Sequence, residues 1–225
     1  MPHGVSIIAM AKVVEVNIPI CNLPLALHGF TVVQISDIHV GPTIKRGYLE
    51  AIVEAVNKLD ADMIAVTGDL VDGSVRELTS HTAPLAKLSA RHGAYFVTGN
   101  HEYYSNAHSW IDEIRRLGLT VLMNEHRLLA HDGETVLVAG VTDYLAHHFD
   151  ESHRSDPHAA LAGAPPDITI KMLLAHQPRS ASAAADAGFD LQLSGHTHGG
   201  QFFPWNLFVP LQQPYTSGLN RLQQL

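Results

Sequence analysis

Short apolar runs alternate with polar clusters along this chain. Five of the runs are rich in apolar and β-branched residues and have the length of a buried strand, and a polar cluster with Gly, Asp, Asn or His follows each of them. The pattern therefore predicts five strands that end beside potential ligands. These runs are 32–36, 63–67, 94–98, 171–175 and 190–194.

Helical patterns lie between the predicted strands. Apolar residues recur at helical spacing across 49–59, and again across 110–117, where Gly118 ends the pattern. Such alternation of strands and helices predicts an α/β fold. In folds of this kind, functional groups gather beyond the carboxyl ends of the strands.

A hairpin and a long loop complete the pattern. The polar segment 131–134 separates the strand-like runs 127–130 and 135–141, as a hairpin turn would, so the sheet is predicted to be mixed. The polar stretch 142–166 contains three prolines, and we expect it to be a loop with one short helix.

Composition narrows the class of protein. The chain has 225 residues, 46% of them hydrophobic, which is typical of one globular domain spanning 1–225. Its net charge is −8, so nucleic-acid binding is disfavoured. Cys21 is the only cysteine, which excludes an internal disulfide. No signal peptide or spanning segment is evident, and we expect a cytoplasmic protein.

Histidines outnumber lysines and arginines, 16 to 14, and several lie in the clusters that follow the predicted strands. These clusters supply carboxylate, amide and imidazole donors without sulfur, a mixture that suits Mn, Fe or Zn. The donors are too many for one four-coordinate zinc, whereas two ions about 3.5–4 Å apart and sharing a carboxylate would use them all. The alternative is that these side chains cap turns without metal. The candidates are Asp37, His39, Asp69, Asn100, His176, His196 and His198.

These five blocks, in this order, resemble the calcineurin-like metallophosphoesterase superfamily. The motif Gly195-His196-Thr197-His198-Gly199-Gly200-Gln201 is similar to that of its bacterial branch of membrane- or cell-wall-associated phosphodiesterases. The resemblance extends over about residues 13–219. It implies a four-layer α/β/β/α sandwich of two mixed sheets. It also implies that the family's last C-terminal strands are missing here, since the chain stops at Leu225.

The resemblance assigns roles to the candidate residues. Asp69 would bridge two divalent metal ions, and His101 would face the substrate as general acid. Glu102 would orient the His101 ring or keep it protonated. Asp37, His39 and His198 would hold the first ion, and Asn100, His176 and His196 the second.

A mechanism follows from these roles. Two cations would generate a bridging hydroxide, which attacks phosphorus in line with the leaving ester oxygen, while His101 protonates that oxygen. The substrate is expected to be a small phosphodiester, linked to lipid or cell wall, rather than a monoester. Lys45 and Arg46 are candidates for substrate contact or for plain surface residues. The alternatives are a non-catalytic metal-binding scaffold and a hydrolase of a non-phosphate ester.

Other features stay open between two interpretations. Asp72 could hydrogen-bond a ligand histidine or cap the helix that follows it. The aromatic run 202–208 could meet lipid, which would allow peripheral membrane contact, but core packing is favoured. Gly199 and Gly200 could cradle phosphate, although a tight turn is favoured. A sheet edge left exposed by the short C-terminus could pair with a second copy of the chain.

The long loop adds three histidines, and a third metal site there is one interpretation. Solvated loop histidines are favoured instead. The residues concerned are His147, His148 and His153.

Overall fold

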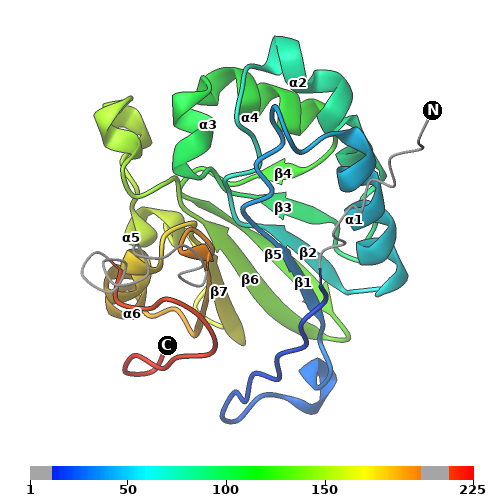
Figure 1. Cartoon of the computed structure of the whole chain (residues 1–225). Helices are drawn as coiled ribbons and strands as arrows, with labels where there is room; N and C mark the ends of the chain where they lie inside the picture. Colours follow the sequence, from blue (N-terminus) through cyan, green and yellow to red (C-terminus); the bar gives the residue numbers. More distant parts are fainter. Residues whose placement is uncertain (1–11, 199–212) are drawn as a thin grey trace, which may run out of the picture.

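Two four-stranded sheets pack face to face in the computed structural model, which describes residues 12–198 and 213–225 (Figure 1). All strand pairs of the first sheet are parallel. In order across the sheet, its strands are β1 (Val32–Ile35), β2 (Met63–Val66), β3 (Ala94–Phe96) and β4 (Thr120–Val121).

The second sheet is mixed. Its first pair is antiparallel, and the remaining pairs are parallel. The predicted two-sheet α/β architecture is confirmed. The antiparallel pair lies in the second sheet, whereas the described strands of the first sheet are all parallel. In order, the strands are β5 (Glu125–His131), β6 (Glu134–Gly140), β7 (Ile170–Leu174) and β8 (Leu191–Leu193).

Helices cover the outer face of the first sheet. The predicted apolar faces are confirmed except at Leu59, which follows α1 and is exposed; residues such as Leu49 and Trp110 are buried in one core with Ile64, Val66 and Phe96 of the strands. Trp110 also donates its indole N–H to the carbonyl of Gly73, which satisfies the one polar atom of that side chain. The helices of this part of the chain are α1 (Arg46–Lys58), α2 (Val75–Thr82), α3 (Asn100–Tyr104) and α4 (Ala107–Arg116).

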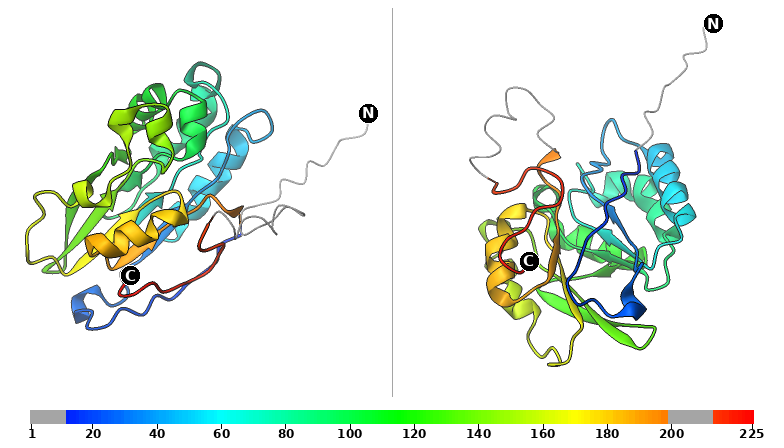
Figure 2. Two further views of the ribbon diagram at one scale, coloured as in Figure 1. Left: turned by 90° about the vertical axis from the view of Figure 1, so that its left-hand side faces the viewer. Right: turned by 90° about the horizontal axis from the view of Figure 1, so that it is seen from below.

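The inner faces of both sheets form a second core. Side chains alternate along a strand, so Met63 and Ala65 point away from the helices and toward Val136 and Val138 of the facing sheet. Two helices, α5 (Pro157–Ala160) and α6 (Ala181–Ala187), pack on the outer face of the second sheet. Figure 2 shows the resulting order of layers, helices, sheet, sheet, helices.

The predicted hairpin and loop are also present. A two-residue turn at Asp132 and Gly133, both with positive φ, joins β5 to β6. The long loop after β6 holds two short 3-10 helices before α5. The 3-10 helices are η1 (Leu25–Leu27), η2 (Ala83–Lys87), η3 (Ala146–His148), η4 (Glu151–His153) and η5 (Pro178–Ser180).

Some expectations concern residues outside this description. Gly199, Gly200 and the aromatic run 202–208 lie outside the described residues. Residues 213–225 form no helix or strand. Among the described residues, no helix is both long and apolar enough to span a bilayer.

Candidate metal centre

Polar side chains from both sheets meet at one end of the molecule. Asp37, Asp69 and Asn100 follow strands of the first sheet, and His176 and His196 follow strands of the second. The Gln34 side chain donates to the carbonyl of Ser194 at 2.9 Å, which ties β1 to the end of β8. The carboxyl ends of strands from two sheets are therefore held together, and their polar clusters converge.

The first group consists of Asp37, His39 and His198. Nε2 of His39 lies 3.3 Å from Nε2 of His198, and Oδ1 of Asp37 lies 3.4 Å from that same His198 atom. Two imidazole nitrogens and a carboxylate oxygen at these separations suit the coordination sphere of one divalent ion.

The second group consists of Asp69, His176 and His196. Nε2 of His176 lies 3.1 Å from Oδ2 of Asp69 and 3.1 Å from Nδ1 of His196. Asn100 is buried, and its Oδ1 is one of the few buried side-chain atoms without a hydrogen-bond partner in the described part of the chain. A buried amide oxygen left unpaired costs free energy unless something binds it. This donor set fits a metal ion.

Asp69 lies within reach of both groups. Its carboxylate belongs to the second group and also to a set with His39 and His101, in which all ligand atoms lie within 4.8 Å of one another. The remaining oxygen, Oδ1, accepts the backbone N–H of His101 at 2.9 Å, so the carboxylate is fixed in place.

Hydrogen bonds orient the imidazoles. Nδ1 of His176 donates to the carbonyl of Thr67 at 2.7 Å, which leaves Nε2 directed at Asp69. Nδ1 of His39 lies 3.2 Å from Oδ1 of Asp72, which leaves its Nε2 directed at His198. Such contacts set the tautomer of a metal-binding histidine and its orientation.

The backbone at the site is held in an unusual conformation. Five of the seven candidate ligands have positive φ, between 48° and 74°, a region that costs non-glycine residues free energy. Strain of this kind at the ends of separate strands persists only where the surrounding structure enforces it. These residues are Asp37, His39, Asp69, His196 and His198.

Glycines allow the chain segments to approach closely. A Cβ on Gly195 would overlap Oγ of Ser36 and Oδ2 of Asp37, and a Cβ on Gly99 would overlap the Asp69 carboxylate. The backbone N–H of His196 reaches both oxygens of Asp37 at 3.0 Å. Glycine is therefore required before His196 and Asn100 for steric reasons.

Glu102 has a different role from the one that the resemblance implies. It is 1% exposed, and its carboxylate accepts backbone N–H groups of Gly99, Asp69 and Leu70 at 2.7–3.0 Å. No hydrogen bond to the His101 ring is found for it in the described structure. Glu102 therefore fixes the two loops that carry Asp69 and Asn100. It does not orient the His101 ring by direct contact, and the alternative that it keeps this ring protonated stays a prediction.

Asp72 occupies the position expected for Glu102. Its Oδ1 lies 2.5 Å from Nδ1 of His101 and 3.2 Å from Nδ1 of His39. Ser74, not Asp72, caps α2, through a capping box with Glu77. The Ser-x-x-Glu pattern was the sequence signal that could have settled this alternative.

Charges in the second group perturb one another. Burial alone would lower the pKa of His176, but the hydrogen bond and charge of Asp69 outweigh it and raise that pKa to about 9. Burial and the charge of His176 lower the pKa of His196 to about 4. Burial opposes ionisation of Asp69, but His176 more than compensates and lowers its pKa. Burial and the charge of Asp69 raise the pKa of Glu102.

Lys45 and Arg46, the two cationic candidates for substrate contact, differ in their surroundings. Arg46 is committed to Glu50, at 2.8 Å, and to the carbonyl of Ser80, while Lys45 is the N-cap of α1. Sequence reasoning missed Arg179. Its guanidinium lies over the Tyr144 ring, 5.0 Å from the centroid, and its charge contributes to the lowered pKa of His196.

Comparisons with known proteins agree with this geometry. The sequence model of the calcineurin-like phosphoesterase family matches residues 30–200. A "transmembrane protein with metallophosphoesterase domain" from Danio rerio is 39% identical over 95% of this chain and 50% of that protein. A protein of the same description from Bos taurus is 39% identical over 94% of this chain and 50% of its own length. The chain thus spans about half the length of these relatives.

A solved structure supports the fold. Calcineurin-like phosphoesterase YfkN from Bacillus subtilis has a TM-score of 0.54 and 13% identity, over 77% of this chain and 72% of that one. Two packed sheets with metal-binding side chains at the strand ends define the class of metallophosphoesterases. This chain belongs to the calcineurin-like phosphoesterase family, as the sequence motifs predict. Membership supports metal-dependent hydrolysis of phosphoric esters.

The relatives also correct one expectation. Both the Danio rerio and the Bos taurus proteins are described as transmembrane proteins, so the expectation of a cytoplasmic protein is wrong. The expectation rested on the absence of a spanning segment in this sequence. The chain matches only about half the length of each of these relatives.

Proposed function

We propose that this chain is a dinuclear metal-dependent phosphoesterase that prefers diesters. The observation that supports it most is the arrangement of donors, two groups of three with Asp69 within reach of both. The buried and unpaired Oδ1 of Asn100, beyond the end of β3, adds a further donor. Asp37, His39 and His198 would hold one ion. Asn100, His176 and His196 would hold the other, and Asp69 would bridge them. Mn, Fe and Zn suit these ligands.

The protein's own groups position the reaction. When bound, two divalent cations supply a water of lowered pKa as nucleophile and bind the phosphoryl oxygens. Asp72 and the carbonyl of Thr67 orient the imidazoles of His39 and His176, and Glu102 holds the Asp69 and Asn100 loops at a fixed separation. No covalent intermediate with the protein is required.

His101 is suited to donate a proton to the leaving oxygen. Its side chain is 35% exposed, so a substrate can reach it, while Asp72 fixes the ring through Nδ1. That contact leaves Nε2 on the side of the metal centre, 3.9 Å from Oδ2 of Asp69. General-acid assistance of this kind contributes about 10²- to 10⁴-fold to a rate.

Aromatic side chains beside His101 support a preference for diesters. The Tyr104 ring lies 5.4 Å from that of His101 and 5.7 Å from that of Phe149, and both aromatic residues are largely exposed. A diester carries a second organic group besides the leaving group, and this additional group can pack on the rings. The charge of Arg179, which contributes to the lowered pKa of His196, would add to the attraction of the phosphoryl group. A lipid-linked or cell-wall-linked phosphodiester has this chemistry.

The test compares two synthetic aryl esters. With Mn²⁺, the full chain is expected to hydrolyse bis(p-nitrophenyl) phosphate with a higher kcat/KM than p-nitrophenyl phosphate. Chelation should abolish turnover, and orthovanadate should inhibit it, because it mimics a phosphoryl group. A higher kcat/KM for the monoester would refute the diester preference.

The scaffold alternative predicts a different result. A protein that binds metal at this centre, yet hydrolyses neither ester with Mn, Fe, Co, Ni or Zn, is not an enzyme of this class. If the protein instead hydrolyses a carboxylic ester and orthovanadate does not inhibit this reaction, its substrate is a non-phosphate ester.

A further inference from the structure

A second cluster of potential ligands lies outside the metal centre. His108 is in the first turn of α4, whereas Asp150 and His153 belong to the loop after β6. None of the three is among the seven candidate ligands described above. We propose that His108, Asp150 and His153 form a separate mononuclear Zn²⁺ site.

The separations suit a tetrahedral ion. Nε2 of His108 lies 3.0 Å from Oδ2 of Asp150, and Nε2 of His153 lies 4.0 Å from that same oxygen. All three ligand atoms lie within 4.8 Å of one another. Tetrahedral zinc with bonds of about 2.0–2.2 Å separates its ligands by about 3.3–3.6 Å, so small side-chain movements close the site.

Neighbouring groups already hold two of the ligands. Nδ1 of His153 is hydrogen-bonded to the Tyr103 hydroxyl at 2.9 Å, which leaves Nε2 for a metal. The backbone carbonyl of His153 accepts the Thr142 hydroxyl at 2.7 Å. Oδ1 of Asp150 accepts both the N–H and the hydroxyl of Ser152, which leaves Oδ2 facing the histidines. Orientation by such partners is characteristic of metal-binding side chains.

A simple ion pair does not account for the whole cluster. It would explain the contact between His108 and Asp150, but not the convergence of a third ligand, His153, whose largely buried side chain brings Nε2 to 4.0 Å from the same oxygen and its ring to 4.8 Å from that of His108. His147 and His148 contact each other, with ring centroids 4.1 Å apart, and are not part of the cluster. The favoured interpretation of solvated loop histidines therefore does not fit His153.

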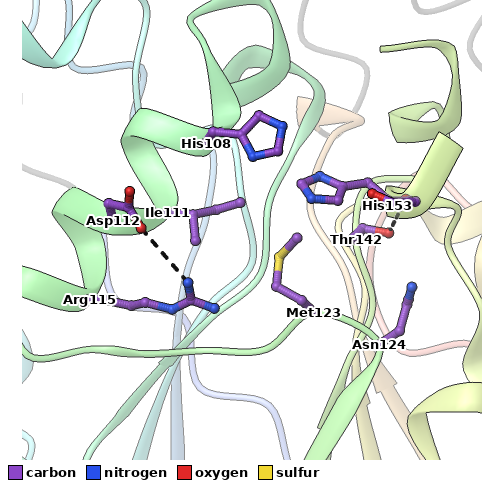
Figure 3. Close-up of a pocket in the computed structure, with 9 residues that line it drawn as sticks. His108, Ile111, Asp112, Arg115, Met123, Asn124, Thr142 and His153 are labelled. Atoms are coloured by element: carbon purple, nitrogen blue, oxygen red, sulfur yellow. Dashed lines mark hydrogen bonds and ion pairs between the residues drawn. The ribbon is translucent and has the colours of Figure 1, made fainter. Parts of the chain in front are cut away.

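Space for a further ligand lies beside the cluster. A cavity of about 260 Å³ is lined by His108 and His153 together with Ile111, Arg115 and Met123. Figure 3 shows the two imidazoles close together at one side of this cavity, one from α4 and one from the loop. Zinc with three protein ligands keeps its fourth position for water or a small anion, and the cavity provides that room.

Zinc here would fasten the loop to the helices. The loop carries Tyr144 and Phe149, and Tyr103, which contacts His153, comes two residues after His101 on α3. The Phe149 ring lies 5.7 Å from that of Tyr104. An ion at this site would therefore hold the aromatic surface beside His101 in place.

Zn²⁺ titration of the full chain tests the site, with His108→Ala as the main variant. The His108 side chain is 68% exposed, so this variant should fold. We expect it to bind one Zn²⁺ fewer than wild type, or to bind that ion more than about 100-fold more weakly. Tyr103→Phe should keep the ion with about 10- to 100-fold weaker affinity. The matched control is His147→Ala, which should bind as wild type does.

Hydrogen exchange provides a second measurement. Zn²⁺ should slow exchange of the backbone amides of residues 150–153 in wild type and in His147→Ala, but not in His108→Ala. The proposal is overturned if His108→Ala and His147→Ala bind equal numbers of Zn²⁺ ions with equal affinity. It is also overturned if His147→Ala alone loses the ion.

Discussion

At the scale of single residues, Asp72 acts on two imidazoles at once. Its Oδ1 contacts Nδ1 of His39 and Nδ1 of His101, so one carboxylate orients a candidate ligand and the candidate proton donor together. Asp72 itself is outside the set of atoms that would reach a metal. We therefore treat it as a positioning residue.

Substitution of Asp72 tests this role. In Asp72→Asn the neutral amide is a weaker acceptor, and we predict a loss in kcat of about 10- to 100-fold with a smaller change in KM. The control is Asp112→Asn on α4, whose exposed carboxylate contacts only Arg115, at 3.9 Å, among the ion pairs of the described residues. Equal kcat values for the two variants would show that Asp72 positions nothing in the reaction.

At the scale of elements, the ends of β1 and β8 come together across the two sheets. Gly195 is the contact point, since a Cβ there would overlap Ser36 and Asp37. The strand ends were predictable from the sequence because each apolar run stops at a polar cluster, and parallel strands place such clusters at one edge. Six of the seven candidate ligands, all but Asn100, lie in the converging groups for that reason.

Other features of the site could not be predicted from the sequence. Two of the three partners of Glu102 are backbone N–H groups of a loop more than 30 residues away, and His108 approaches His153 only after the loop folds over α4. Side-chain type and spacing carry no signal for contacts between segments so far apart in the sequence. The resemblance placed Glu102 behind the His101 ring, whereas its hydrogen bonds go to the backbone N–H groups of Gly99, Asp69 and Leu70.

Alanine at position 195 tests the contact between the sheets. In Gly195→Ala the end of β8 must move away from β1, and we predict destabilisation of about 1–3 kcal/mol with loss of metal from the group that contains Asp37. The control, Gly47→Ala in α1, meets open space and should change stability by no more than about 1 kcal/mol, in the stabilising direction. Denaturant unfolding and metal analysis measure both effects. Wild-type values for Gly195→Ala would refute the steric argument.

At the scale of the whole molecule, folding buries Asp69 and His176 as an ion pair, which a metal ion bound to His176 must replace. His176 has its pKa raised from 6.5 to about 9, so this contribution to the stability of the metal-free protein is complete below pH 6.5 and is lost as the pH rises through 9. A metal ion on Nε2 requires the neutral ring. Metal and proton therefore compete at His176.

This competition predicts proton release on metal binding. At pH 7 one proton should leave His176 for each chain loaded, whereas His196, with a pKa of about 4, is already neutral and releases none. Apparent affinity should rise by about tenfold per pH unit between pH 7 and 9. Calorimetric titration with Mn²⁺ in buffers of different ionisation enthalpy counts the protons. Affinity that is independent of pH over this range would contradict the ion pair.

The most direct test of the two-metal centre is the metal content of Asp69→Asn, measured in a His108→Ala background to remove the proposed zinc site. We predict two ions per chain in the His108→Ala parent. When Asp69 is also changed, binding at both positions should weaken, and hydrolysis of the aryl phosphodiester should fall to the background rate. If Asp69→Asn retains both ions with unchanged affinity, Asp69 does not bridge them and the account of the centre is wrong.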